Sequence, residues 1–176
     1  VSWMLSREIA SEFALELSEW WQLDLAGLAT IADQVPLQEA NRSFAWWGIK
    51  ALQHTERLGL RALLSQAAVK QDEIDETTIN YVLAPRINAM GRLAHGLEAL
   101  RLLCTTNQNR AYLLAEKIND LNTQRQKLTD DLLRIALSQQ TEWEREPLII
   151  VASPAYHEGV IGLVAGKLSE QFHKPA

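Results

Sequence analysis

Three short segments of the 176-residue chain carry polar side chains that could bind a phosphate or a metal ion. The first ends at Asp33, which follows a run of small and apolar residues (25–32) and precedes Pro36. A carboxylate at the C-terminal end of a buried helix is costly unless it is paired or bound to a cation. Asp33 is therefore a candidate metal ligand. The alternative is an Asp whose side chain caps the loop that follows.

The second segment contains Arg86, Asn88, Gly91 and Arg92. A proline and two glycines interrupt the region 85–96, so we expect an ordered loop there. Two guanidinium groups and an amide could clamp a phosphate, and a glycine lets the backbone approach it. The alternative is a loop whose arginines pair with nearby carboxylates.

The third segment contains His157 and Gly159 and lies between an expected strand (148–152) and an expected helix (160–172). A loop that leads into a helix N-terminus can bind an anion, and the imidazole of His157 could add a donor. A histidine with a structural role is the alternative. The sequence shows no convincing Ser-His-Asp or Cys-His set.

The composition is that of a globular domain, with 47% hydrophobic and 22% charged residues. The net charge of −5 argues against nucleic-acid binding by bulk positive charge, but a local basic groove is compatible with it. The one cysteine, Cys104, excludes an internal disulfide and indicates an intracellular location. No apolar run is long enough to span a membrane. The first residue is Val1, which fits a fragment of a longer protein.

The elements that must position these residues are mostly helical, within an overall α/β fold class. The longest is a helix over 108–141, which contains no Gly or Pro and has apolar residues three and four apart. Arg125 falls on this apolar stripe, where a charge is unusual. The β-branched run 148–152 predicts a buried strand. The other helices are expected over 3–21, 25–34, 38–52, 56–68, 97–104 and 160–172.

Taken in order, these segments resemble the RecJ family of the DHH phosphoesterase superfamily. The most specific match is the sequence LAPRINAMGRL at 83–93. The stretch DLAGLATIADQVPL at 24–37 is similar to the family's fourth phosphoesterase motif. LNTQR at 121–125 resembles the long helix that joins the two lobes of the family. HEGVIG at 157–162 and FHKP at 172–175 resemble the opening of the DHHA1 substrate-binding domain.

The resemblance implies three parts: the end of a DHH catalytic domain (1–104), a long linking helix (105–145) and the start of a DHHA1 domain (146–176). It implies a 5′-to-3′ exonuclease of DNA repair and recombination, which hydrolyses phosphodiester bonds with Mn²⁺ or Mg²⁺. The family's metal-ligand role maps onto Asp33. The expected substrate-binding residues are Arg86, Asn88, Gly91, Arg92, Arg125, His157 and Gly159.

The resemblance also implies partners and a location. We expect single-stranded DNA as the substrate, a single-strand-binding protein as a further partner, a monomer, no membrane contact and a cytoplasmic location. The Asp-His-His sequence that names the superfamily is absent from this chain, as is the late Gly-Gly-His motif. We therefore expect this chain alone to be inactive. Two alternatives stay open: a phosphodiesterase for oligoribonucleotides or cyclic dinucleotides, and an inactive scaffold that binds replication proteins.

Overall fold

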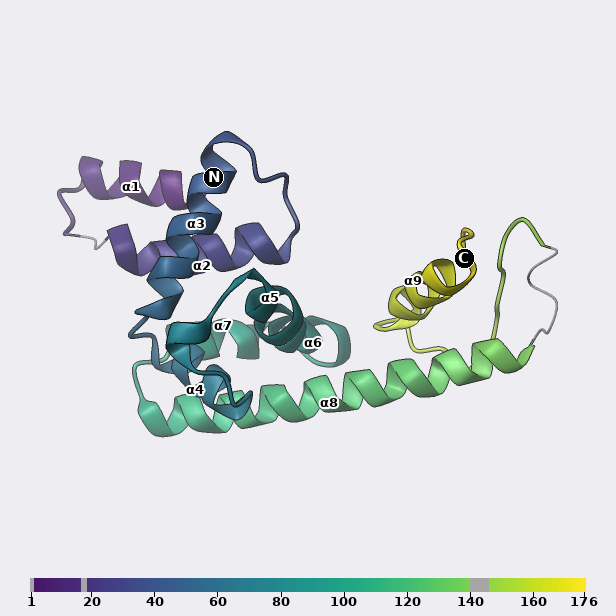
Figure 1. Ribbon diagram of the computed structural model, residues 1–176. Helices are drawn as coiled ribbons and strands as arrows, with labels where there is room; N and C mark the ends of the chain where they lie inside the picture. The colour runs from purple at the N-terminus through teal and green to yellow at the C-terminus, as the bar shows by residue number, and fades with distance from the viewer. Residues whose placement is uncertain (1, 17–18, 140–145) are drawn as a thin grey trace.

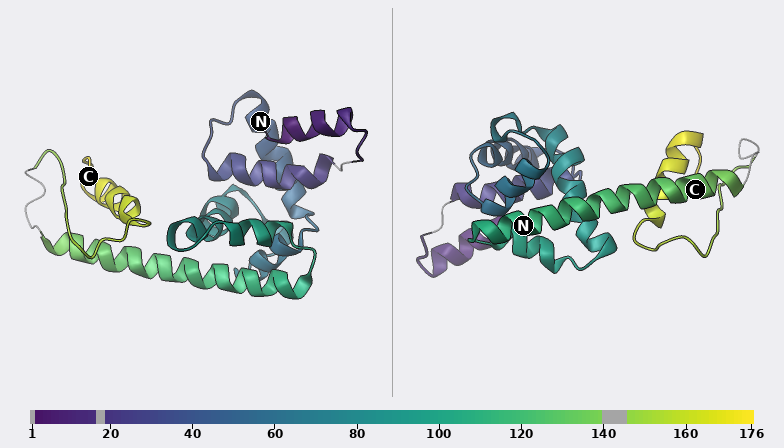
Figure 2. Two further views of the ribbon diagram at one scale, coloured as in Figure 1. Left: turned by 180° about the vertical axis from the view of Figure 1, so that it is seen from behind. Right: turned by 90° about the horizontal axis from the view of Figure 1, so that it is seen from below.

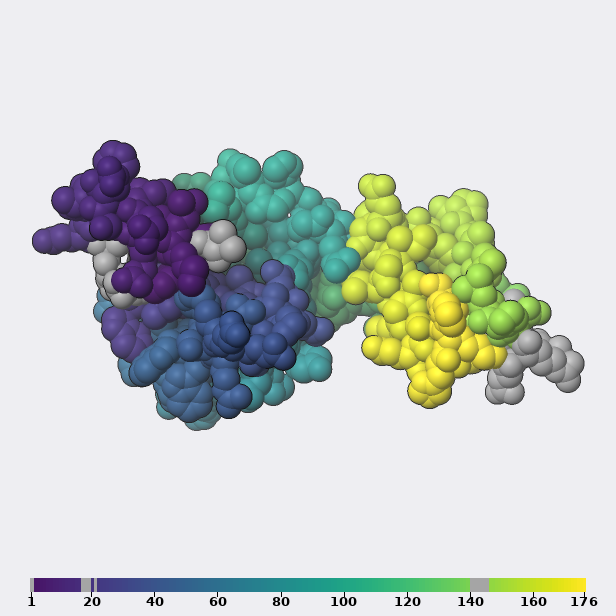
Figure 3. Space-filling view, turned by 90° about the horizontal axis from the view of Figure 1, so that it is seen from above, coloured from purple at the N-terminus to yellow at the C-terminus, as the bar shows by residue number. Residues whose placement is uncertain are grey.

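The computed structural model describes residues 2–16, 19–139 and 146–176, and these residues form two helical bodies on one long helix (Figure 1). The long helix is α8, which runs over 32 residues from Gln108 to Gln139. It confirms the helix predicted from 108, while residues 140–145 of the predicted linking segment lie outside the described range. Figure 3 shows the two bodies separated by a narrower waist.

The first body begins with α1 (Ser2–Glu12), α2 (Glu19–Ala32) and α3 (Glu39–Gln53). The axes of α2 and α3 cross where two glycines meet. A Cβ atom added to Gly27 would lie 2.4 Å from the Cα atom of Gly48. This crossing therefore requires glycine on both helices, because a side chain would overlap with backbone atoms.

The rest of the first body packs against the first half of α8 (Figure 2). Its core contains Leu60, Leu63, Met90 and Leu102 together with Ile118 of α8, all of them buried. The long helix is thus part of this core. The elements between α3 and α8 are α4 (Leu58–Gln66), η1 (Gln71–Glu73), α5 (Glu76–Thr78), η2 (Ile79–Leu83), α6 (Ala84–Leu93) and α7 (Leu97–Cys104).

The second body consists of α9 (Ile161–Phe172) and the loop before it, packed on the second half of α8. Leu132 and Ala136 of α8 meet Val160, Val164 and Leu168 in a separate small core. Burial of these apolar side chains holds the second body to the helix.

Three predictions about the elements are corrected. The segment expected to be a loop is helix α6, because Pro85 sits in its first turn, where a missing N–H costs nothing. The helix expected over 3–21 is interrupted: α1 ends at Glu12, Ala14 has a left-handed φ of 49°, and residues 17–18 lie outside the described range.

The third correction concerns the predicted strand. None of the described residues forms a strand. The expected α/β class therefore has only its helices in the described part of the chain, and the strand expected over 148–152 is absent there. Within 148–152, the N–H of Ile149 donates to the carbonyl oxygen of Pro175 at 2.9 Å. None of the described helices is long and apolar enough to cross a membrane.

Candidate nucleic-acid interface

The end of α6 touches the loop before α9 through Arg92 and Gly159. Arg92 Nη1 donates to the carbonyl oxygen of Gly159 at 3.3 Å, across 67 positions of sequence. A Cβ atom added to Gly159 would lie 2.0 Å from the carbonyl oxygen of Arg92. The absence of a side chain at 159 is therefore what allows the two bodies to meet at this point.

Arg125 lies near this junction, on the middle of α8. Its Nη2 donates to Oδ1 of Asn122 at 3.0 Å, while its Nε is buried without a hydrogen-bond partner. Burial lowers the pKa of Arg125, and the positive charge of Arg92 lowers it further; Asp130 acts in the opposite direction. The sequence placed Arg125 on an apolar stripe, and the structure shows it half-buried there.

Neither Arg92 nor Arg125 has a directly bound carboxylate among the described residues, although Asp130 lies close enough to act on the charge of Arg125. Within the described ranges neither arginine forms an ion pair, and Asp130 is paired with Lys167 at 2.7 Å. Two neighbouring guanidinium groups without a directly bound carboxylate are a favourable place for an anion, since an anion would relieve their repulsion.

His157 adds a possible donor to this junction. Its Nδ1 accepts the N–H of Gly159 at 3.0 Å, so in the neutral ring the proton is on Nε2. The imidazole is exposed. An Nε2–H that points to solvent can donate to a phosphate oxygen.

A groove of about 520 Å³ continues from Arg125 between α8 and α9. Thr129 and Asp130 line it from α8, and Gly162, Gly166 and Lys167 line it from α9. A Cβ atom at either glycine would have no neighbour within 4 Å, so this wall of the groove is open. Polar and apolar groups both line the groove, and its charged residues are the cations Arg125 and Lys167 and the acids Asp130 and Glu170.

The predicted residues of α6 separate into two groups. Arg86, in the first turn, is half-buried: its Nε donates to Asn119 Oδ1 at 3.1 Å and its Nη1 donates to Val82 O at 2.9 Å. Burial lowers the pKa of Arg86. Asn88, Gly91 and Arg92 are exposed. On a helix with 100° per residue, Arg86 lies on a different face from Asn88 and Arg92.

Two asparagines of α8 were missed as site residues by the sequence reasoning. Asn119 holds Arg86, and Asn122, which is only 2% exposed, holds Arg125. The available signal was that polar residues 119, 122 and 125 follow each other three apart in the middle of an otherwise apolar stripe. A buried amide that binds a guanidinium fixes the position of the arginine.

Asp33 lies elsewhere, in the turn directly after α2. The backbone N–H of Asp33 donates to Ala29 O at 3.0 Å, and the residue is exposed. The argument that burial makes this carboxylate costly is therefore wrong, since solvent reaches it. Among the residues that the structure describes, no group of three or more His, Cys, Asp or Glu side chains could hold a metal ion. Asp33 can supply one ligand, and the described residues do not complete a metal centre.

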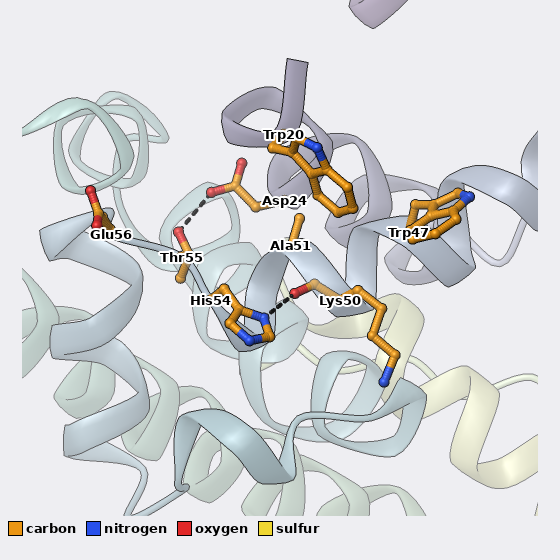
Figure 4. Close-up of a pocket in the computed structure, with 8 residues that line it drawn as sticks. All are labelled: Trp20, Asp24, Trp47, Lys50, Ala51, His54, Thr55 and Glu56. Atoms are coloured by element: carbon orange, nitrogen blue, oxygen red, sulfur yellow. Dashed lines mark hydrogen bonds between the residues drawn. The ribbon is translucent and has the colours of Figure 1, made fainter. Parts of the chain in front are cut away.

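The buried acid of this region is Asp24, which the sequence reasoning did not single out. Arg57 Nε and Thr55 Oγ1 each donate to Asp24 Oδ2 at 2.8 Å, and the Asp24 side chain is 2% exposed. Figure 4 shows Asp24 with Thr55 and Trp20 beside a pocket of about 510 Å³ between α2 and α3. Because its oxygens already accept these hydrogen bonds, Asp24 connects α2 to the start of α4 and has a structural role.

The chain is similar over its whole length to proteins named single-stranded-DNA-specific exonuclease RecJ. It is 37% identical to the protein of Bacillus subtilis, with 100% of this chain and 22% of the relative covered. It is 32% identical to the protein of Escherichia coli, with 98% of this chain and 30% of the relative covered. The chain belongs to the RecJ family. It spans less than a third of the length of these two relatives.

Solved RecJ structures share the fold of this RecJ-family chain. A crystal structure of RecJ from Thermus thermophilus in complex with Mg²⁺ matches with a TM-score of 0.84 and 31% identity, over 94% of this chain and 26% of that one. A crystal structure of exonuclease RecJ bound to manganese matches with a TM-score of 0.86 and 30% identity, over 99% of this chain and 44% of that one. No protein-family model matches the chain.

Proposed function

We propose that this chain is part of a metal-dependent exonuclease and that its junction of two bodies binds the phosphates of single-stranded DNA. The observation that carries the proposal is the pair Arg92 and Arg125, which come from different elements and have no carboxylate partner within the described ranges. His157 would donate to a phosphate oxygen from Nε2. Gly159, which has no side chain, lets the loop before α9 come close to Arg92. Asn88 and Gly91 are proposed to extend the phosphate contacts along α6, and Arg86, on the face of α6 that meets Asn119, is proposed as a separate contact.

The proposed contribution of this chain to metal binding is one ligand, the carboxylate of Asp33. RecJ structures that resemble the chain were solved with Mg²⁺ or Mn²⁺, and either ion prefers oxygen ligands. A divalent ion bound at such a site activates water and stabilises negative charge on the phosphate that is cleaved. The remaining ligands would come from other parts of a longer protein.

The finer features of the function are supported by the resemblance of the motifs. They comprise digestion in the 5′-to-3′ direction, a role in DNA repair and recombination in the cytoplasm, action as a monomer, and contact with a single-strand-binding protein. The same motifs support the division into a DHH part (1–104), a linking helix (105–145) and a DHHA1 part (146–176).

A binding experiment tests the phosphate site on this chain directly. Fluorescence anisotropy with a labelled oligothymidylate should show that Arg92→Gln and Arg125→Gln weaken binding and each lower the slope of log K against log salt by roughly 1. Arg110→Gln is the matched control, since Arg110 is an exposed arginine in the first turn of the same helix. Equal losses of affinity in all three variants would show that the DNA is attracted by the overall positive charge and not by a specific site.

Activity is tested on the longer protein that contains this chain. Asp33→Asn should abolish Mn²⁺-dependent release of nucleotides from single-stranded DNA, and near-normal activity would remove Asp33 from the metal site. Substrates blocked at the 5′ or the 3′ end give the direction. Preferred cleavage of dinucleotides or cyclic dinucleotides would favour the oligonucleotide phosphodiesterase instead, and absence of all cleavage would favour the scaffold.

A further inference from the structure

One face of α3 carries two cations and an aromatic side chain in a row. Arg42, Trp46 and Lys50 are four residues apart, so successive members lie one turn apart on the same side of the helix. All three are exposed, and Trp46 retains 62% of its accessible surface. Its neighbour Trp47 is 48% exposed and packs against Trp20 of α2.

The two tryptophans differ in their contacts. Trp47 is held edge-on against Trp20, with ring centroids 5.4 Å apart. Trp46 has Lys50 Nζ at 5.8 Å from its ring centroid, a cation–π distance. Among the described residues, Arg42 and Lys50 form no ion pair with a carboxylate. This face therefore offers an indole ring and uncompensated positive charge side by side.

A groove of about 980 Å³ connects this face to the end of α2. Arg42, Trp46 and Lys50 line it from α3, and Ile31 of α2 and Gln34 of the turn after α2 also line it. Asp33 lies between these last two residues in sequence, so the proposed metal ligand is next to one end of the groove. The groove is too large for a single side chain and is open to solvent.

We infer that Trp46 is a base-stacking platform for single-stranded nucleic acid, with Arg42 and Lys50 beside it to bind the backbone. Indole rings stack on any base, and flanking cations follow the phosphates, which is how single strands are held without sequence preference. The inference rests on the proposed function and adds a subsite to it, on a different helix from the junction of Arg92 and Arg125.

Acidic residues that also line the groove restrict where the phosphates of the strand can lie. Asp75 and Glu76 line it from the start of α5. Their negative charges would repel phosphates, so the backbone is expected along α3. The groove thus combines cationic residues of α3 with acidic residues at the start of α5, and a neutral apolar peptide would need neither.

The test measures the binding of two oligonucleotides by the intact 176-residue chain. Trp46→Ala should weaken binding of a labelled oligothymidylate by about 5- to 150-fold, the range for loss of one stacked base. Binding of an abasic oligonucleotide of the same length should change little, because it has no base to stack. Trp46→Phe should retain most of the affinity, since a ring is still present.

Tyr112→Ala is the matched control, because Tyr112 is a 54% exposed aromatic residue on α8 and does not line this groove. Equal binding by the wild type and Trp46→Ala would overturn the inference and leave the phosphate site of Arg92 and Arg125 standing. Lack of binding by the wild-type chain would contradict both. Dimers in sedimentation that Trp46→Ala dissociates, without a change in oligonucleotide binding, would assign the face to a second copy and also overturn the inference.

Discussion

The carbonyl oxygen of Arg92 lies 2.0 Å from the position that a Cβ atom would take at Gly159, so these two residues meet backbone to backbone. This contact joins the C-terminal end of α6 to the loop before α9. Arg92 also donates from its side chain to the Gly159 carbonyl oxygen. One glycine thus fixes the distance between the two bodies at the place where the proposed phosphate ligands Arg92, Arg125 and His157 gather.

Gly159→Ala should separate the two bodies locally. The new methyl group overlaps with a backbone oxygen, which cannot rotate away as a side chain can. We expect a loss of about 1–3 kcal/mol in the free energy of unfolding and weaker binding of oligothymidylate. Urea denaturation and anisotropy measure the two effects. Gly166→Ala in α9 is the control for the unfolding measurement: its Cβ meets nothing within 4 Å, so it should stabilise by up to about 1 kcal/mol.

Replacement of Arg125 by Met should stabilise the chain while it weakens anion binding. The wild-type guanidinium is half-buried, has an Nε without a partner and is repelled by Arg92, and Met removes all three costs. Arg125→Met also removes the donor to Asn122 Oδ1, and we expect a higher melting temperature because the three costs together exceed that one hydrogen bond. Inorganic phosphate should raise the melting temperature of the wild type more than that of the variant. A lower melting temperature for the variant than for the wild type would show that Arg125 stabilises the fold.

Gly27→Ala should strongly destabilise the first body. Its Cβ would lie 2.4 Å from Gly48 Cα and 3.0 Å from Phe44 O, so α2 and α3 would have to move apart. Overpacking of this kind costs about 1–3 kcal/mol. Gly91→Ala is a matched helical control with open space, and it should stabilise by about 0.5–1 kcal/mol. Urea denaturation measures the free energy of unfolding of both variants. A change in the same direction for both would contradict the close crossing of α2 and α3 at Gly27 and Gly48.

Acid should remove a part of the stability that depends on Asp75. The backbone N–H of Thr78 donates to Asp75 Oδ1 at 2.7 Å and its hydroxyl donates to the same atom at 2.8 Å. These bonds lower the pKa of Asp75 below its ordinary value of 3.8. A lowered carboxyl pKa means that the stability is fully present above pH 3.8 and is lost as the pH falls from there through the folded-state pKa.

Asp75→Asn keeps a hydrogen-bond acceptor but cannot titrate. The variant should therefore show a shallower loss of melting temperature on acidification than the wild type. Thr78→Val removes one of the two donors and should give an intermediate slope. Identical slopes for all three proteins would show that this helix cap does not contribute to the pH dependence.

The sequence predicted the helices well where the local pattern was strong. Residues 108–139 contain no Gly or Pro and carry apolar residues three and four apart, and they form one helix. Pro36 indicated correctly that the preceding helix stops before it, at Ala32. The same local reasoning failed for 84–93, because Pro85 and Gly91 break a helix only in some positions. Pro85 follows a π-helical turn (Ile79–Leu83) and begins the next helix, which the sequence pattern alone does not reveal.

What the sequence by itself determined is the family and the chemical types in the candidate site: arginines, an asparagine, a histidine and a single acid, Asp33. Motifs and local periodicity carry this information because they depend on neighbouring residues. The tertiary structure decided which of these side chains meet. It brought Arg92 next to Arg125 and Gly159, left Arg86 with Asn119, and exposed Trp46, since contacts between distant segments depend on how helices cross and pack.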